Sequence, residues 1–149
     1  MPIPPLTKKT GHLPFGEFVA TLPEIESRFG MSSIRRKELM SGVKKAVLNF
    51  QRAGINKIWI DGSFISARKE PQEIDGCWEY HKNVDLTRLD RCFANVDRND
   101  MKFRYGLDFF PSNGIEFLSQ KPFPYFFQFS RDGLKKGIII LNITEVKLV

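Results

Sequence analysis

The chain has 149 residues, which fits one domain of roughly 100–200 residues that buries its core without disulfides or metals. Its 23 lysines and arginines outnumber its 17 aspartates and glutamates, and the net charge of +6 favours polyanionic partners such as nucleotides, nucleic acids or anionic lipid. Two cysteines without a Cys-x-x-Cys pair, and the lack of a signal-peptide or membrane-length apolar stretch, argue against structural zinc and membrane insertion and predict a cytoplasmic protein.

The N-terminal segment predicts an arm followed by a short helix. We interpret residues 1–20, which are rich in proline, as an extended arm of a single domain that spans residues 1–149. Thr21 and Glu24 have the Thr-x-x-Glu spacing of a capping box and are expected to start a helix. We expect that helix to end near Gly30.

A longer helix is the clearest element of the sequence. It begins after Ser32 or Ser33, and Gly54 is expected to end it as a left-handed C-cap. Its apolar residues recur at helical spacing and form one continuous face: Leu39, Val43, Ala46, Val47 and Phe50. Its basic residues take the other faces, and we interpret them as a solvated surface: Arg35, Arg36, Lys37, Lys44, Lys45 and Arg52.

The rest of the chain alternates between apolar runs and turn residues, which indicates an α/β domain. Residues 86–94 predict a short helix, and residues 115–129 form an aromatic segment that prolines interrupt. The many phenylalanines of the chain either complete the core or cover a partner surface. Apolar, β-branched runs bounded by turn residues predict strands at 55–60, 73–79, 103–110 and 137–143.

Two polar motifs follow or lie on these predicted strands. Gly62 and Ser63 come directly after the strand at 55–60, where a glycine lets the backbone approach a ligand and turn amides can donate to phosphate oxygens. Glu73 and Asp75 are two residues apart on the next strand, so both side chains point to one face. Two carboxylates this close favour a divalent cation, and Mg²⁺ held in this way also binds substrate phosphates.

A third acid extends the pattern. Asp108 lies between two apolar residues of the predicted strand at 103–110, where a buried charge needs a partner. Each motif also has a structural interpretation, because Gly-Ser is a common turn and an aspartate often caps a strand end. Arg68 and Lys69, in the loop between the two motifs, either neutralise phosphate charge or are solvated.

Together these motifs resemble the signature of the nucleotidyltransferase superfamily. Gly62-Ser63, a gap of nine residues and then Glu73-Ile74-Asp75-Gly76 match its spacing, and Leu107-Asp108-Phe109 is similar to its third acidic strand. From about Thr21 to Ile143 the chain is similar to small stand-alone bacterial nucleotidyltransferase-like proteins. Glu73 departs from the pattern, since the superfamily usually has aspartate there and the extra methylene moves the carboxylate by about 1.5 Å.

The resemblance implies a nucleotidyltransferase-like fold, with a mixed β-sheet flanked by helices. It implies transfer of a nucleoside monophosphate, most simply AMP, from a nucleoside triphosphate to a protein or RNA hydroxyl. As catalytic acids and ligands of Mg²⁺ or Mn²⁺ it assigns Glu73, Asp75 and Asp108. As nucleotide-binding residues we expect Gly62, Ser63, Arg68 and Lys69.

Two further expectations concern partners and activity. The resemblance implies a cognate toxin, antitoxin or phage-defence partner, and no membrane association is expected. The alternative to an enzyme is a catalytically inactive module that binds nucleotide, RNA or a partner protein. Glu73 favours that alternative, whereas the retention of all three acids and of the Gly-Ser turn favours the enzyme.

Overall fold

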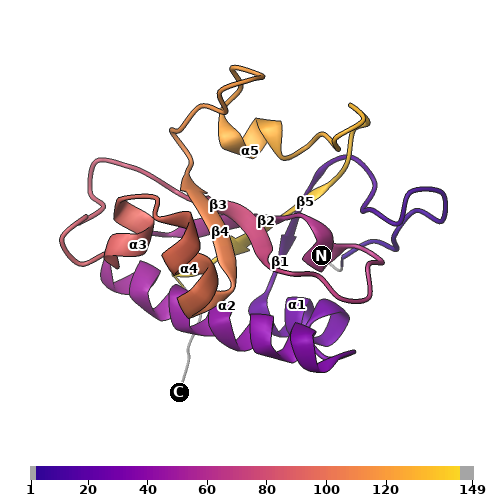
Figure 1. Ribbon diagram of the computed structural model, residues 1–149, viewed down its shortest axis with the longest axis horizontal. Coiled ribbons are helices and arrows are strands. Elements are labelled where there is room, and N and C mark those ends of the chain that lie inside the picture. The colour runs from indigo at the N-terminus through magenta and orange to yellow at the C-terminus, as the bar shows by residue number, and fades with distance from the viewer. Residues whose placement is uncertain (1–2, 145–149) are drawn as a thin grey trace.

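The computed structural model describes residues 3–144. Helices pack around a five-stranded sheet (Figure 1). The elements in chain order are β1 (Glu17–Ala20), α1 (Leu22–Phe29), α2 (Ile34–Arg52), β2 (Lys57–Asp61), the 3₁₀ turn η1 (Ser63–Ile65), β3 (Ile74–Trp78), α3 (Arg91–Ala94), α4 (Arg98–Tyr105), β4 (Leu107–Pro111), α5 (Phe123–Phe126) and β5 (Ile138–Asn142).

The strand order is β1-β5-β2-β3-β4. β1 is parallel to β5 and β3 is parallel to β4, whereas β2 is antiparallel to both of its neighbours, β5 and β3. The protein is therefore a mixed α/β domain, as the alternation of elements predicts. No helix among residues 3–144 is both long enough and apolar enough to span a bilayer.

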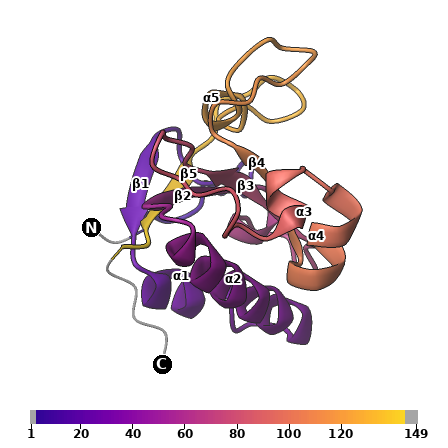
Figure 2. The same cartoon turned by 90° about the vertical axis from the view of Figure 1, so that its left-hand side faces the viewer.

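The two faces of the sheet have different surroundings. α1 and α2 lie against one face, while α5 and its flanking loops stand on the opposite side (Figure 2). Ile58 and Ile60 of β2 point to the helical face and are fully buried there. The apolar stripe predicted for α2 packs into this core, with all of its members buried: Leu39, Val43, Ala46, Val47 and Phe50.

The caps predicted from the sequence define both of the first two helices. The Thr21 hydroxyl accepts from the Glu24 amide at 3.2 Å, and the Glu24 carboxylate accepts from the Thr21 amide at 3.2 Å, which completes the capping box. Gly30 is the C-cap of α1. Of the two candidate serines, Ser33 caps α2, and Gly54 follows that helix with a φ of +86°. These helix ends depend on local hydrogen bonds, which is why the sequence predicts them.

The strand predicted at 103–110 is wrong in its first part, because α4 continues to Tyr105 and β4 begins only at Leu107. Asp97 caps α4 by accepting from the Asp100 amide at 3.2 Å, and Gly106 ends the helix with a φ of +71°. Phe103, which we expected inside a strand, is 90 % exposed on the helix surface.

Two other boundaries also differ from expectation. The helix expected at 86–94 is confined to the single turn of α3. We expected residues 1–20 to form an extended arm, and this is wrong for the end of the segment. Glu17–Ala20 is a strand of the sheet, and Leu13 is buried in the core. Pairing with β5 therefore makes the end of the N-terminal segment a strand. The residues after 144, in which apolar and basic side chains partly alternate in the sequence, lie outside the described residues.

Candidate functional site

Three aspartates form a row across three adjacent strands. Asp61 at the end of β2 lies directly opposite Asp75 of β3, and Asp75 lies directly opposite Asp108 of β4. Directly opposed residues share a face of the sheet, and this face is the one that Ile60 and Ile74 do not use. Like charges directly opposite each other destabilise a sheet, so the row requires compensating positive charge.

Glu73 joins this row from the residue just before β3. One carboxylate oxygen from each of Glu73, Asp75 and Asp108 lies within 4.8 Å of the others. The three acids that the sequence singled out thus lie together. A set of carboxylate oxygens at this spacing suits a hard divalent cation such as Mg²⁺ or Mn²⁺.

Basic side chains neutralise the two ends of the aspartate row. Lys136 Nζ lies 3.2 Å from Asp61 Oδ2. Arg98 donates from Nε to Asp108 Oδ1 at 2.9 Å and from Nη2 to Asp108 Oδ2 at 2.8 Å, a bidentate pair. Asp75 forms no ion pair with any cation in the described part of the chain. The centre of the row is therefore its electrostatically unfavourable point.

Two aspartates of the row, Asp75 and Asp61, have raised pKa values. Burial, together with the charges of Asp108, Glu73 and Asp61, raises the pKa of Asp75 to about 7. Burial also raises the pKa of Asp61 to about 6, against the attraction of Lys136. Asp61 Oδ1 is buried and has no hydrogen-bond partner among residues 3–144. A bound cation or a proton would relieve this repulsion.

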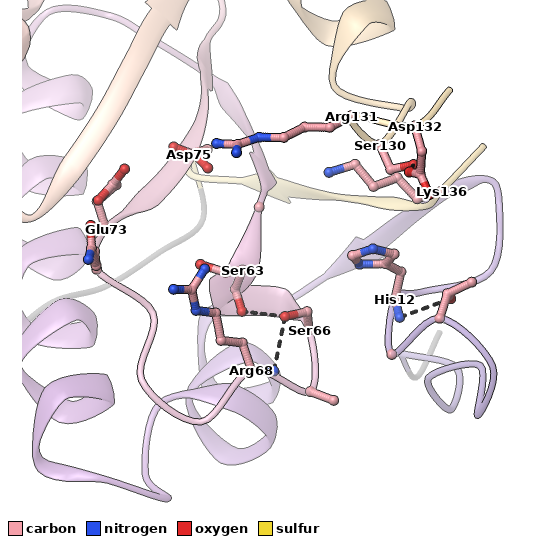
Figure 3. Close-up of a pocket in the computed structure, with 15 residues that line it drawn as sticks. His12, Ser63, Ser66, Arg68, Glu73, Asp75, Ser130, Arg131, Asp132 and Lys136 are labelled. Carbon is pink, nitrogen blue, oxygen red and sulfur yellow. Dashed lines mark hydrogen bonds between the residues drawn. The ribbon is translucent and has the colours of Figure 1, made fainter. Parts of the chain in front are cut away.

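A cavity of about 590 Å³ opens beside the acids (Figure 3). This volume is in the range of small-molecule sites, roughly 300–1,000 Å³. Glu73 and Asp75 lie on one side, and Lys136 and His12 come from other segments of the chain. Burial, with the charge of Lys136, lowers the pKa of His12. The other polar side chains of the wall are Thr10, Ser63, Ser66, Arg68, Gln72, Ser130, Arg131 and Asp132. The cavity thus has an acidic side and a largely basic or hydroxyl-bearing side.

The turn after β2 fits closely around Asp75. Gly62 has φ +88° and ψ −164°, a region that essentially only glycine occupies. A Cβ atom on Gly62 would lie 2.3 Å from Asp75 Oδ2, so the missing side chain makes room for this carboxylate. From the sequence we expected a ligand to approach the backbone at Gly62. In the structure the Asp75 carboxylate of the acidic row lies there. Ser63 follows it on η1 and lines the cavity.

Replacing Gly62 by alanine should destabilise the protein by at least about 1–3 kcal/mol, the usual cost of this backbone conformation, because the clash with Asp75 adds to it. The free energy of unfolding in urea measures the effect. Gly133→Ala is the matched control, since Gly133 also has a positive φ of +81° but no atom within 4 Å of the added Cβ. Equal losses in both variants would show that Asp75 moves aside without resistance.

Arg36 of α2 binds the loop that forms part of the cavity wall. We interpreted this residue as part of a solvated helix face, and this is wrong, since Arg36 is 4 % exposed. Its guanidinium donates to the carbonyl oxygens of Phe64 at 2.6 Å, Ser66 at 3.1 Å and Arg68 at 2.5 Å. It also donates to Phe29 at the end of α1, at 2.9 Å. Arg36 thus ties the loop with the Gly-Ser turn to the helical layer.

The other predicted nucleotide-binding residues differ in position. Arg68 lines the cavity, whereas Lys69 is exposed and is not part of the wall. Sequence reasoning missed Asp61, Lys136 and Arg98. Asp61 could have been noticed in the sequence, because it is a charged residue at the end of an apolar strand and next to the Gly-Ser turn. Its position opposite Asp75 follows only from the pairing of β2 with β3.

Comparison with known proteins identifies a family but no activity. No curated protein and no solved structure shows a significant match to this chain. One family pattern matches residues 4–142, which include every strand of the sheet and the whole acidic row. The chain therefore belongs to DUF6932, a family of unknown function.

Proposed function

We propose that this protein is a metal-dependent nucleotidyltransferase-like protein, in which the acidic row binds Mg²⁺ or Mn²⁺ and the cavity binds a nucleoside triphosphate. The observation that carries the proposal is the approach of Glu73, Asp75 and Asp108 within 4.8 Å, beside a cavity whose wall contains the Gly62-Ser63 turn. The nucleotidyltransferase superfamily arranges its motifs in the same order. On this view the mixed sheet is a nucleotidyltransferase-like sheet.

The side chains of the site fit this chemistry. The donor set is all oxygen, and the central carboxylate lacks a cation among residues 3–144, so a divalent ion would relieve repulsion at Asp75. At Asp108 the same ion would have to displace Arg98. When bound, such an ion polarises a phosphoryl oxygen and stabilises the leaving pyrophosphate. Ser63, Arg68, Arg131 and Lys136 supply hydroxyl and cationic donors for the phosphates.

One feature of the site favours the inactive alternative. Arg98 already occupies both oxygens of Asp108, and an arginine in this position supplies the charge that a metal would supply. The Arg98 side chain is 55 % exposed, however, while that of Asp108 is 7 % exposed. On the proposed function, a metal at Asp108 displaces Arg98, which would turn toward solvent and give up its two hydrogen bonds to Asp108. An inactive protein would bind nucleotide without turnover.

Nucleotide with metal should stabilise the protein. A ligand that binds only the folded state at about 100 times its Kd adds roughly 2.7 kcal/mol, which raises the melting temperature of a chain of this size by about 5–10 °C. Thermal unfolding is measured with ATP and MgCl₂ together, with ATP and EDTA, and with MgCl₂ alone. A shift only in the first mixture supports the proposal, and no shift at millimolar ATP and metal contradicts it.

Turnover separates the enzyme from the binding module. Incubation with α-³²P-labelled ATP and Mg²⁺, with and without bacterial lysate, would label a protein or RNA acceptor if AMP is transferred. Labelling that fails with the Asp75→Asn variant would assign the reaction to this site. A cognate protein partner from a toxin–antitoxin or defence system remains part of the proposal, and a labelled protein acceptor would be its first candidate.

A further inference from the structure

The segment between β4 and β5 is not explained by the acidic site alone. It stands on the face of the sheet opposite to α1 and α2 (Figures 1 and 2). Residues 121–137 contain four cations, Lys121, Arg131, Lys135 and Lys136, against the single acid Asp132. Five of the seven residues from Phe123 to Phe129 are aromatic.

Only some of these rings are needed for the core. Phe123 and Phe127 pack on the apolar cluster of Trp59, Cys77 and Ile138, which covers part of the open face of the sheet. Phe123 also stacks on Phe110 of β4, with ring centroids 4.2 Å apart. The inner rings thus fasten the segment to the sheet, and their burial explains their presence.

The outer rings instead alternate with lysines. Lys121 Nζ lies 4.0 Å from the ring centroid of Phe129 and 5.1 Å from that of Tyr125. Lys135 pairs with Phe129 through the backbone, and its Nζ lies 5.1 Å from the ring centroid of Phe15. Tyr125 and Phe15 are 47 % and 50 % exposed. We name these five residues, Phe15, Lys121, Tyr125, Phe129 and Lys135, the aromatic–lysine strip.

The strip is continuous with the cavity. Ser130 follows Phe129 directly, and Ser130, Arg131 and Lys136 line the cavity wall. Figure 3 shows Arg131 extending across the cavity toward Asp75. A chain-like ligand lying on the strip therefore has a path, marked by cations, to the acidic row.

We propose that the aromatic–lysine strip binds single-stranded nucleic acid, with one end of the strand entering the cavity as the acceptor. Exposed rings provide stacking surfaces for bases of any sequence, and lysines held beside them neutralise the phosphates between the bases. A lipid surface fits less well, because a flat bilayer cannot follow the strip into the cavity. Acceptor use depends on the proposed function, whereas strand binding itself does not.

Fluorescence anisotropy with a labelled 20-nucleotide single-stranded RNA of mixed sequence tests this surface, in EDTA and without nucleotide. The Lys121→Ala/Lys135→Ala variant should bind at least tenfold more weakly, and its log–log salt slope should fall by about 1.4, the change expected for two lost phosphate contacts. Tyr125→Ala should weaken binding by about tenfold through lost stacking. Duplex RNA of the same length should bind more weakly than the single strand.

The control has the same change of charge elsewhere. Lys37→Ala/Lys45→Ala removes two exposed lysines from α2, on the opposite side of the molecule, and should change the affinity less than twofold. Thermal unfolding confirms that each variant is folded. Equal losses in the strip and control variants would overturn the proposal, as would equal binding of duplex and single strand. Binding of phosphatidylserine vesicles without RNA binding would also overturn it and identify a lipid surface.

The test distinguishes this proposal from the proposed function. If RNA binding depends on the strip but ATP with Mg²⁺ gives no thermal shift, the surface is established and the nucleotide site is wrong. If the thermal shift is present and RNA binds the strip variant as well as it binds the wild type, the nucleotide site stands and the strip proposal fails.

Discussion

The Asp75→Asn variant is expected to be more stable than the wild-type protein in metal-free buffer at pH 8. Asp75 is ionised there, next to three other carboxylates and without a cation partner in the described residues. The rise in the pKa of Asp75 from 3.8 to about 7 corresponds to an upper limit of about 4 kcal/mol at about 1.4 kcal/mol per unit. Asparagine is also polar and partly buried, so we expect about half of this, a gain of about 2 kcal/mol and a rise of about 4–8 °C in melting temperature. The same change should abolish the stabilisation by ATP with Mg²⁺, because it removes the central carboxylate of the cluster.

The pH dependence has a definite sign. Burial and the neighbouring acids raise the pKa of Asp75 to about 7, well above its value of 3.8 in the unfolded chain, so the folded state binds more protons between these values. This contribution to stability is therefore present at low pH and is lost as the pH rises from about 4 to about 7. Asp61 adds a similar loss that ends at about pH 6. The advantage of Asp75→Asn over wild type should grow across the same range.

Urea unfolding of both proteins from pH 4.5 to pH 8.5 measures this difference. Asp85→Asn is a control of opposite sign, because hydrogen bonds from Thr87 lower the pKa of the exposed Asp85 carboxyl and removing the charge removes that stabilisation. If Asp75→Asn instead loses stability at pH 8, Asp75 is a structural ion-pair residue and the metal site is wrongly assigned. Breaking a buried ion pair costs about 3–5 kcal/mol.

Replacing Arg36 by methionine should destabilise the protein by about 3 kcal/mol. Methionine fills much of the volume but donates no hydrogen bond, so the carbonyl groups of Phe64, Ser66 and Phe29 lose a buried donor. An orphaned buried polar group costs about 1–3 kcal/mol, and the recovered desolvation of the guanidinium offsets part of the sum. Burial lowers the pKa of Arg36, in accordance with that desolvation.

Lys37→Met is the matched control, since Lys37 is the next residue of α2, is exposed and undergoes the same change from cation to thioether. We expect it to stay within about 0.5 kcal/mol of the wild type. Hydrogen exchange gives a second measurement, in which loss of Arg36 should speed exchange of the amides of residues 62–68. Arg36→Lys keeps the charge without the planar fork and should recover only part of the stability. Equal stability of the two methionine variants would contradict the positioning role of Arg36.

The elements whose signals are local could be predicted from the amino-acid sequence. The capping box at Thr21 and Glu24 and the apolar stripe of α2 each depend on residues within a few turns of one helix, so they were predicted correctly. α4 also has local signals, the cap at Asp97 and the left-handed Gly106, but the apolar run at 103–110 obscured them. Propensity alone did not separate a helix end from the start of the next strand.

The candidate acids were likewise identifiable as residues but not as an arrangement. Spacing placed Glu73 and Asp75 near each other, because strand side chains alternate. The row of Asp61, Asp75 and Asp108 depends on the registers of β2 with β3 and of β3 with β4, which bring together residues far apart in the chain. Long-range pairing of this kind leaves no periodic pattern in a single sequence, so Asp61 was missed.

Whether a charged side chain is solvated or structural depends on tertiary packing. On the helical repeat Arg36 is equivalent to its basic neighbours, and its burial depends on the loop after β2 packing over that turn of α2. Lys136 and Arg98 also become partners of the acidic row only when β5 and α4 are in place. Helical periodicity fixes the direction of a side chain relative to its own helix, whereas its solvation depends on which distant segment covers it.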